Sequence, residues 1–254
     1  MRYVSSLSGG VASAVAHYRA VQRYGKENVL PWFADTLWED EDLYRFLADF
    51  EAFIGQKIYR HTEGRTPLEV AEAQHIIPNS RIAPCSLVLK QRPFKRFIEN
   101  YPKPVTVLLG LDWSEQHRMD APRRVYEAIP GVSVDFPLMW KPYDYDIFQT
   151  VRNWGIEIPR LYRLGFPHNN CGGRCVRQGV REWRRLRNFF PARFEEVAVW
   201  ETHQRAQGDA RKDFAICRVQ SGGVVRPLPL PEIEAREIRQ GALQEDLFSC
   251  FCTY

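Results

Sequence analysis

The chain has no apolar run of about 18 residues or more, the length that crosses a bilayer as a helix. It also lacks a signal-peptide pattern at its start, an internal repeat and a low-complexity segment. These absences favour a cytoplasmic protein with no membrane partner. At 254 residues, we expect one large domain, or one domain with an appendage.

A disulfide framework is also unexpected, because six cysteines in a cytoplasmic chain of this length favour thiol or metal chemistry. The net charge is only +4, which excludes a strongly basic protein. The charge is nevertheless uneven, since residues 160–193 contain nine arginines and one acid, Glu182. The sequence therefore predicts a local basic patch.

The glycine-rich segment near the start has no Gly-Lys-Ser/Thr ending, which excludes the common Walker-type loop. It reads Ser-Ser-Leu-Ser-Gly-Gly-Val-Ala-Ser over residues 5–13, between a predicted strand and a predicted helix. Gly9 and Gly10 allow close backbone approach to an anion, while Ser8 and Ser13 add hydroxyl groups. This turn is typical of a phosphate site, although a strand-to-helix turn without a ligand explains it too.

Short apolar runs alternate with amphipathic stretches over the first 150 residues. This alternation predicts an α/β fold, a doubly wound and mostly parallel sheet of the Rossmann-like type. We expect a nucleotide-binding domain over residues 1–200 and a small C-terminal extension over 201–254. The predicted strands are 3–7, 28–34, 57–59, 105–109, 132–136 and 214–219. The predicted helices are 11–24, 39–54, 87–100 and 176–190. Residues 224–231 are predicted to form a connector.

Polar residues follow two of these strands. Asp35 ends the second strand, where it could bind a ribose or adenine group, or simply cap the next helix. Gly110 follows the fourth strand and allows close approach of a nucleotide. Beyond it, Arg118 could neutralise phosphate, and Asp112 or Glu115 could hold Mg²⁺ brought by ATP. A surface turn with a helix cap is the alternative.

Three cysteines have the surroundings of a metal or thiol site. Cys85 precedes a predicted helix that carries Lys90, and Cys171 and Cys175 flank two glycines. With His168 as a possible fourth ligand, the set suits a [4Fe–4S] cluster or zinc. Unpaired structural thiols remain the alternative.

Together these segments resemble the phosphoadenylyl-sulfate (PAPS) reductase family of the PP-loop ATP pyrophosphatase superfamily, over roughly residues 3–180. The resemblance rests on the Ser-Gly-Gly-x-x-Ser loop, Asp35-Thr36, the segment Cys85 to Pro93, the segment Gly110 to Arg118, and the stretch from Trp140 to the 165–175 turn. It implies an adenine nucleotide held by Ser8, Gly9, Gly10 and Ser13, with Asp35 at the nucleoside and Lys90 and Arg118 assisting.

The chain departs from the family pattern at its cysteines. Ser86 follows Cys85 where the family's adenylyl-sulfate reductases have a double cysteine, and three residues rather than two separate Cys171 from Cys175. Those reductases use a cysteine near the C-terminus as sulfur nucleophile, which Cys250 and Cys252 resemble in position only. A branch of PP-loop enzymes that thiolates RNA bases is similar in having three cysteines.

The predicted helix 176–190 places arginines on one side, at Arg177, Arg181, Arg184 and Arg185. Such a stripe suits RNA or DNA phosphate, and a solvated helix face explains it equally well.

We therefore expect an enzyme that acts at an adenine-nucleotide anhydride, coupled to sulfur transfer with an iron–sulfur cluster. A thiol-dependent reductase that releases sulfite and a nucleotide-binding module without turnover are the alternatives. A homodimer is possible.

Overall fold

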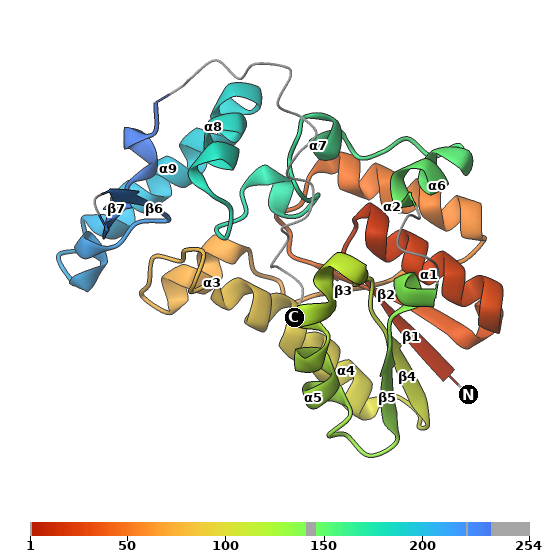
Figure 1. Cartoon of the computed structure of the whole chain (residues 1–254). Coiled ribbons are helices and arrows are strands. Elements are labelled where there is room, and N and C mark those ends of the chain that lie inside the picture. The colour runs from red at the N-terminus through yellow and green to blue at the C-terminus, as the bar shows by residue number, and fades with distance from the viewer. Residues whose placement is uncertain (1, 141–145, 222, 235–254) are drawn as a thin grey trace.

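The computed structural model describes residues 2–140, 146–221 and 223–234. Its centre is a five-stranded sheet in the order β3-β2-β1-β4-β5, with every neighbouring pair parallel (Figure 1). The strands are β1 (Arg2–Leu7), β2 (Val29–Asp35), β3 (Tyr59–Thr62), β4 (Val105–Leu108) and β5 (Val132–Asp135). The predicted α/β class and doubly wound parallel sheet are therefore confirmed.

Each face of the sheet packs against its own helices, because successive residues of a strand point to opposite faces. Phe33 of β2 packs with α1 (Val11–Tyr24) and α2 (Glu41–Ile54), while its neighbour Trp32 packs with α4 (Arg92–Asn100) and α5 (Asp120–Tyr126). Near-continuous burial of β1, β2 and β4 follows from this double cover.

The strand order creates a switch point between β1 and β4. From β1 the chain winds one way, through β2 to β3, and it then crosses back to β4 and β5. The loops that follow β1 and β4 therefore diverge at the carboxyl edge of the sheet, which is where open α/β sheets bind ligands.

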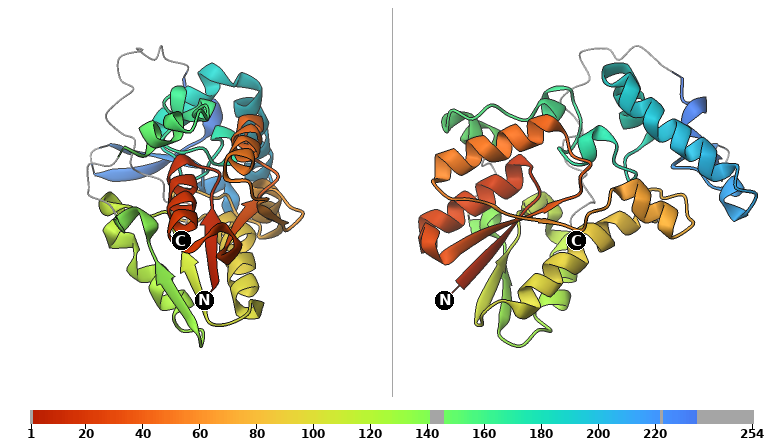
Figure 2. Two further views of the ribbon diagram at one scale, coloured as in Figure 1. Left: turned by 90° about the vertical axis from the view of Figure 1, so that its right-hand side faces the viewer. Right: turned by 180° about the vertical axis from the view of Figure 1, so that it is seen from behind.

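A third core lies beside the sheet and contains α8 (Val180–Phe189) and α9 (Pro191–Arg205). Figures 1 and 2 place these helices away from the strands, together with the antiparallel hairpin of β6 (Cys217–Ser221) and β7 (Val224–Leu228). Trp183 and Phe194 are buried in this core together with Cys171 and Cys175. The turn that contains Cys171 and Cys175, called the cysteine turn below, is therefore held by α8 and α9.

Several predicted boundaries need correction. β3 starts at Tyr59 rather than at 57, β6 starts at Cys217 rather than at 214, and α8 starts at Val180 rather than at 176. The predicted connector 224–231 contains β7, because its prolines are tolerated in an exposed two-stranded hairpin. The predicted helix 87–100 begins as a π-helical turn, Ser86–Gln91, before α4. Helices α3 (Pro67–Ala73), α5 and α9 were not predicted; the remaining short helices are α6 (Ile147–Asn153) and α7 (Arg160–Arg163). No helix in the described ranges is long and apolar enough to cross a bilayer.

Candidate functional site

The loop between β1 and α1 is built from its own serines and glycines. Ser13 accepts hydrogen bonds from the Ser8 backbone N–H at 3.1 Å and from the Ser8 hydroxyl at 3.2 Å, and it donates to the Gly10 carbonyl at 2.9 Å. Gly9 has φ +78°, and a Cβ there would lie 2.6 Å from the Leu43 side chain. The loop conformation therefore requires glycine at this position.

Helix α1 starts without a side-chain cap. Its N-cap residue is Gly10, which makes no side-chain hydrogen bond, and no acidic residue lies in the first turn. The first N–H groups of a helix have no partner inside the helix, and they carry the positive end of its dipole. The start of α1 therefore offers uncapped donors to an anion.

The loop after β4 lies directly against this helix. A Cβ at Gly110 would lie 2.9 Å from the Cα of Ser13 and 3.1 Å from its backbone nitrogen. Only glycine lets β4 end this close to the first turn of α1, so the glycine at position 110 has a packing role. The approach of a nucleotide to Gly110 stays a prediction.

A cavity, called the loop cavity below, opens where the loop after β1 meets the loop after β4, at the switch point of the sheet. Ser8, Gly10 and Ser13 line it from the first loop, and Gly110, Asp112 and Glu115 line it from the second. The segment 167–170 closes another side and places His168 in the same wall. The other lining residues are Ser6, Val11, Ala12, Leu111, Ile147, Phe148, Tyr162, Pro167, Asn169 and Asn170.

Asn169 joins this wall to the loop between β1 and α1, and it was not predicted as a site residue from the sequence. Its side chain is 1% exposed, and its Nδ2 donates to the Gly9 carbonyl at 3.0 Å. The only sequence signal was its position two residues before Cys171. The segment 167–175 is therefore a common border of the loop cavity and the cysteine turn.

Asp112 and Glu115, which follow β4, line the cavity, and Arg118 forms an ion pair beside it. Arg118 pairs with Glu115, and both side chains are largely buried. Burial raises the pKa of Glu115, an effect that the Arg118 charge opposes. Asp112 accepts hydrogen bonds from the Ser114 backbone N–H at 2.9 Å and from its hydroxyl at 2.6 Å.

Asp35 ends β2 as predicted, but it does not line the loop cavity. Its Oδ1 accepts hydrogen bonds from the Tyr44 hydroxyl at 2.8 Å and from the Leu37 backbone N–H at 2.9 Å. Burial, followed by the hydrogen bond to Asp35, raises the pKa of Tyr44. The cap of α2 is Asp40 rather than Asp35.

The three predicted cysteines line one small pocket. Cys171 and Cys175 are buried and Cys85 is half-buried. Lys90 lines this pocket rather than the loop cavity, whereas His168 lines the loop cavity. The structure therefore brings the cysteines together with a lysine and places the histidine elsewhere. Thr36, Pro67, Ala83, Ser86, Arg174, Val176 and Arg177 complete the lining.

A buried glutamate connects the cysteine pocket to the end of β2. The side chain of Glu39 is fully buried, and it accepts hydrogen bonds from the Thr36 hydroxyl at 2.8 Å and from the Cys171 backbone N–H. Lys90 Nζ lies 3.6 Å from its Oε1 and compensates its charge. Glu39 was not predicted as a site residue, because no local sequence signal shows that residues 168–175 fold over it.

The geometry of the cysteines bears on which metal they could hold. In the ranges that the structure describes, no group of three or more His, Cys, Asp or Glu side chains is placed to hold a single metal ion. Cys85, Cys171 and Cys175 nevertheless line one pocket, so they are the candidate thiolates for either a cluster or zinc. The cluster stays a prediction.

The predicted arginine stripe is wrong in part. Arg177 precedes α8, and Arg185 is only 3% exposed, with its guanidinium 5.7 Å from the centre of the Phe166 ring. Burial lowers the pKa of Arg185. Arg181 is exposed and Arg184 is half-buried, so the basic face is narrower than predicted. Cys250 and Cys252 lie outside the described residues.

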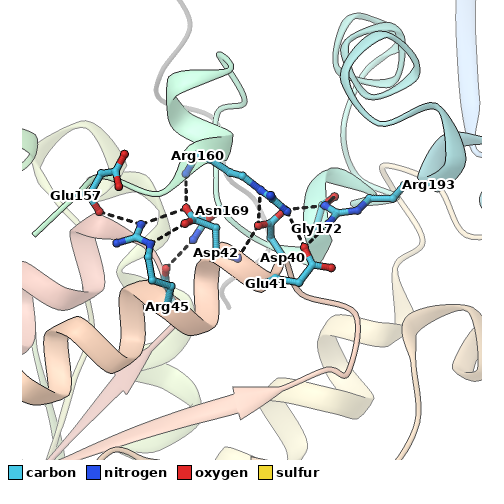
Figure 3. A network of polar contacts seen from close by, with 10 residues as sticks. Asp40, Glu41, Asp42, Arg45, Glu157, Arg160, Asn169, Gly172 and Arg193 are labelled. Carbon is cyan, nitrogen blue, oxygen red and sulfur yellow. Dashed lines mark hydrogen bonds and ion pairs between the residues drawn. The ribbon is translucent and has the colours of Figure 1, made fainter.

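A second network fixes the backbone around the cysteine turn (Figure 3). Asp40, whose side chain is fully buried, pairs with Arg160 at 2.8 Å and with Arg193 at 2.6 Å. Arg193 also donates to the Gly172 carbonyl at 3.1 Å. Helices α2, α7 and α9 are thereby tied to the turn that contains Cys171.

Fold and site together define an α/β protein with a loop of serines and glycines at the switch point of a parallel sheet. No protein-family model and no curated protein matches the sequence. A crystal structure of PAPS reductase from Candida auris, a phosphate complex, matches with 16% identity and a TM-score of 0.46, over 65% of this chain and 79% of that one. A similarity at this level defines no substrate, reaction or site residue in the present chain.

Proposed function

We propose that the protein binds an adenine nucleotide in the loop cavity and acts at its phosphate anhydride. The observation that carries this proposal is the uncapped start of α1, which contributes Gly10, Val11 and Ala12 to the cavity wall. Preorganised N–H donors stabilise the negative charge that develops on a leaving pyrophosphate or sulfate. Ser8 adds a hydroxyl group to the same wall.

The acidic residues of the second loop suit a metal-bound nucleotide. Mg²⁺ is usually held by one or two carboxylates together with substrate phosphates. Asp112 and Glu115 line the cavity that the phosphates would enter. We infer that they hold Mg²⁺ when ATP is bound.

The cysteine pocket supports coupling to sulfur chemistry. Cys85, Cys171 and Cys175 would hold a [4Fe–4S] cluster, which would supply electrons or bind sulfur at an iron without a protein ligand. Glu39 and Lys90 would position the cluster-bearing turn against the end of β2. Sulfur transfer after adenylation of an acceptor is the chemistry that we favour, with reductive release of sulfite as the alternative.

Product analysis tests the reaction. Anaerobically purified protein would be incubated with ATP and Mg²⁺, or with adenylyl sulfate and a thiol, and assayed for pyrophosphate, AMP and sulfite. Pyrophosphate or AMP from ATP would support adenylation, whereas sulfite from adenylyl sulfate, lost on replacing Cys250 and Cys252, would support the reductase. Binding without any product would leave a nucleotide-binding module, and absence of binding would refute the proposal.

Metal analysis tests the cysteine pocket separately. About four irons with acid-labile sulfide per chain, lost in Cys171→Ser and Cys175→Ser, is the expected result. Cys217→Ser is the matched control, because Cys217 is buried but does not line the pocket, and burial raises the pKa of its thiol. Iron-free protein, or iron that survives both substitutions, would contradict the cluster.

A further inference from the structure

We propose that Asn169 recognises a hydroxyl or amino group of the nucleoside, so that the loop cavity selects its ligand by more than phosphate charge. This inference rests on the proposed function, because it concerns the ligand of the same cavity. It assigns a binding role to a residue outside the phosphate loop.

The orientation of the Asn169 side chain is fixed by its one hydrogen bond. Its Nδ2 lies 3.0 Å from the carbonyl oxygen of Gly9. A carbonyl oxygen only accepts hydrogen bonds, so the amide nitrogen and not the amide oxygen has to face Gly9. The side-chain oxygen Oδ1 is therefore left for another partner.

That oxygen has no partner among the residues that the structure describes. The Asn169 side chain is 1% exposed and forms part of the cavity wall, so bulk water does not cover it. An unsatisfied buried acceptor costs about 1–3 kcal/mol. A ligand that donates a hydrogen bond to Oδ1 would remove this cost.

The phosphates themselves cannot be this partner. An ionised phosphate only accepts hydrogen bonds, and it suits the uncapped donors at the start of α1 instead. The ribose hydroxyls and the adenine amino group can donate. The cavity thus combines a donor surface for the phosphates with an acceptor for the nucleoside.

The test is a binding series on the full chain, measured by calorimetry. The probes are pyrophosphate, ATP, and three ATP analogues that lack the 2′-hydroxyl, the 3′-hydroxyl or the amino group. We expect one analogue to bind wild-type protein about three- to tenfold more weakly than ATP, the size of one hydrogen bond. In Asn169→Ala, that analogue and ATP should bind equally.

Asn79→Ala is the matched control, because Asn79 is a buried amide in a turn that lines neither cavity. It should retain the wild-type discrimination between ATP and the analogue. The wild-type series needs no variant, so poor folding of Asn169→Ala does not prevent a decision.

Two results would overturn the inference. Equal binding of ATP and all three analogues by wild-type protein would show that no nucleoside donor reaches Oδ1. Discrimination that persists in Asn169→Ala would assign the contact to another residue. If wild-type protein binds neither pyrophosphate nor ATP, the proposed function itself fails, which is a distinguishable result.

Discussion

At the scale of single residues, the site depends on close approach that only glycine permits. Gly110→Ala would place a Cβ 2.9 Å from the Cα of Ser13, which is backbone and cannot swing away. The first turn of α1 would shift relative to β4, so we expect pyrophosphate affinity to fall by about tenfold or more, or at least ~1.4 kcal/mol. Equilibrium titration measures this.

Gly179→Ala is the control for that substitution. Its added Cβ would meet only the flexible end of Glu182, at 3.2 Å, and Gly179 lines neither cavity. Pyrophosphate affinity should stay within twofold of wild type. Equal losses in the two variants would contradict the assignment of the cavity.

His17 predicts how stability depends on pH. Burial lowers its pKa to about 4 from an ordinary value of 6.5, despite an opposing hydrogen bond with Gln56. The unfolded chain therefore protonates His17 more readily than the folded chain does. The free energy of unfolding that depends on neutral His17 is fully present above pH 6.5 and falls as the pH drops toward 4. Protonation of His17 alone should lower the free energy of unfolding by roughly 2 kcal/mol between pH 7 and pH 5.

Urea unfolding at several pH values measures this loss in wild-type protein and in His17→Leu. The variant should lose less stability on acidification, whereas His203→Gln, at an exposed site, should follow wild type. An unchanged pH dependence in His17→Leu would refute the assignment to His17.

At the scale of elements, the ion pairs at the start of α2 hold the cysteine turn against the sheet domain. Asp40→Asn would retain a cap for α2 but remove the charge that compensates Arg160 and Arg193. Because Asp40 is fully buried while the arginines are partly exposed, we expect a loss of about 2 kcal/mol in the free energy of unfolding.

Glu41→Gln is the matched control on the neighbouring position. Glu41 contacts the same two arginines, but its side chain is 78% exposed. Glu41→Gln should therefore lower the free energy of unfolding by less than about 0.5 kcal/mol. Chemical denaturation compares the two variants. Similar losses for both would show that burial of Asp40 does not set the strength of the network.

The elements also show where local sequence signals are sufficient. Helix α1 has the predicted bounds because its ends carry Gly10 and Gly25. The prolines of 224–231 indicated a connector, yet an exposed hairpin tolerates Pro227. Arg185 lies on the side predicted to face solvent, but Phe166 from a distant segment covers it. The first error came from taking prolines as a break in regular structure, and the second from a contact between separate segments.

At the scale of the whole molecule, the predicted doubly wound sheet placed the two glycine loops together, because parallel strands end at one edge. The sequence did not reveal that Glu39 and Asn169 join the loop cavity to the cysteine pocket. Both contacts link segments more than 100 residues apart, Cys171 to Glu39 and Asn169 to Gly9. Local patterns carry no information at that separation.

The central claim is that phosphates bind at the start of α1. Amide resonances of isotopically labelled protein would be followed by nuclear magnetic resonance while pyrophosphate is added. The account predicts saturable shifts concentrated at the N–H groups of Ser8, Gly10, Val11 and Ala12, and weaker shifts in Gly110→Ala. Shifts confined to the arginines of α8, or none at all, would contradict it.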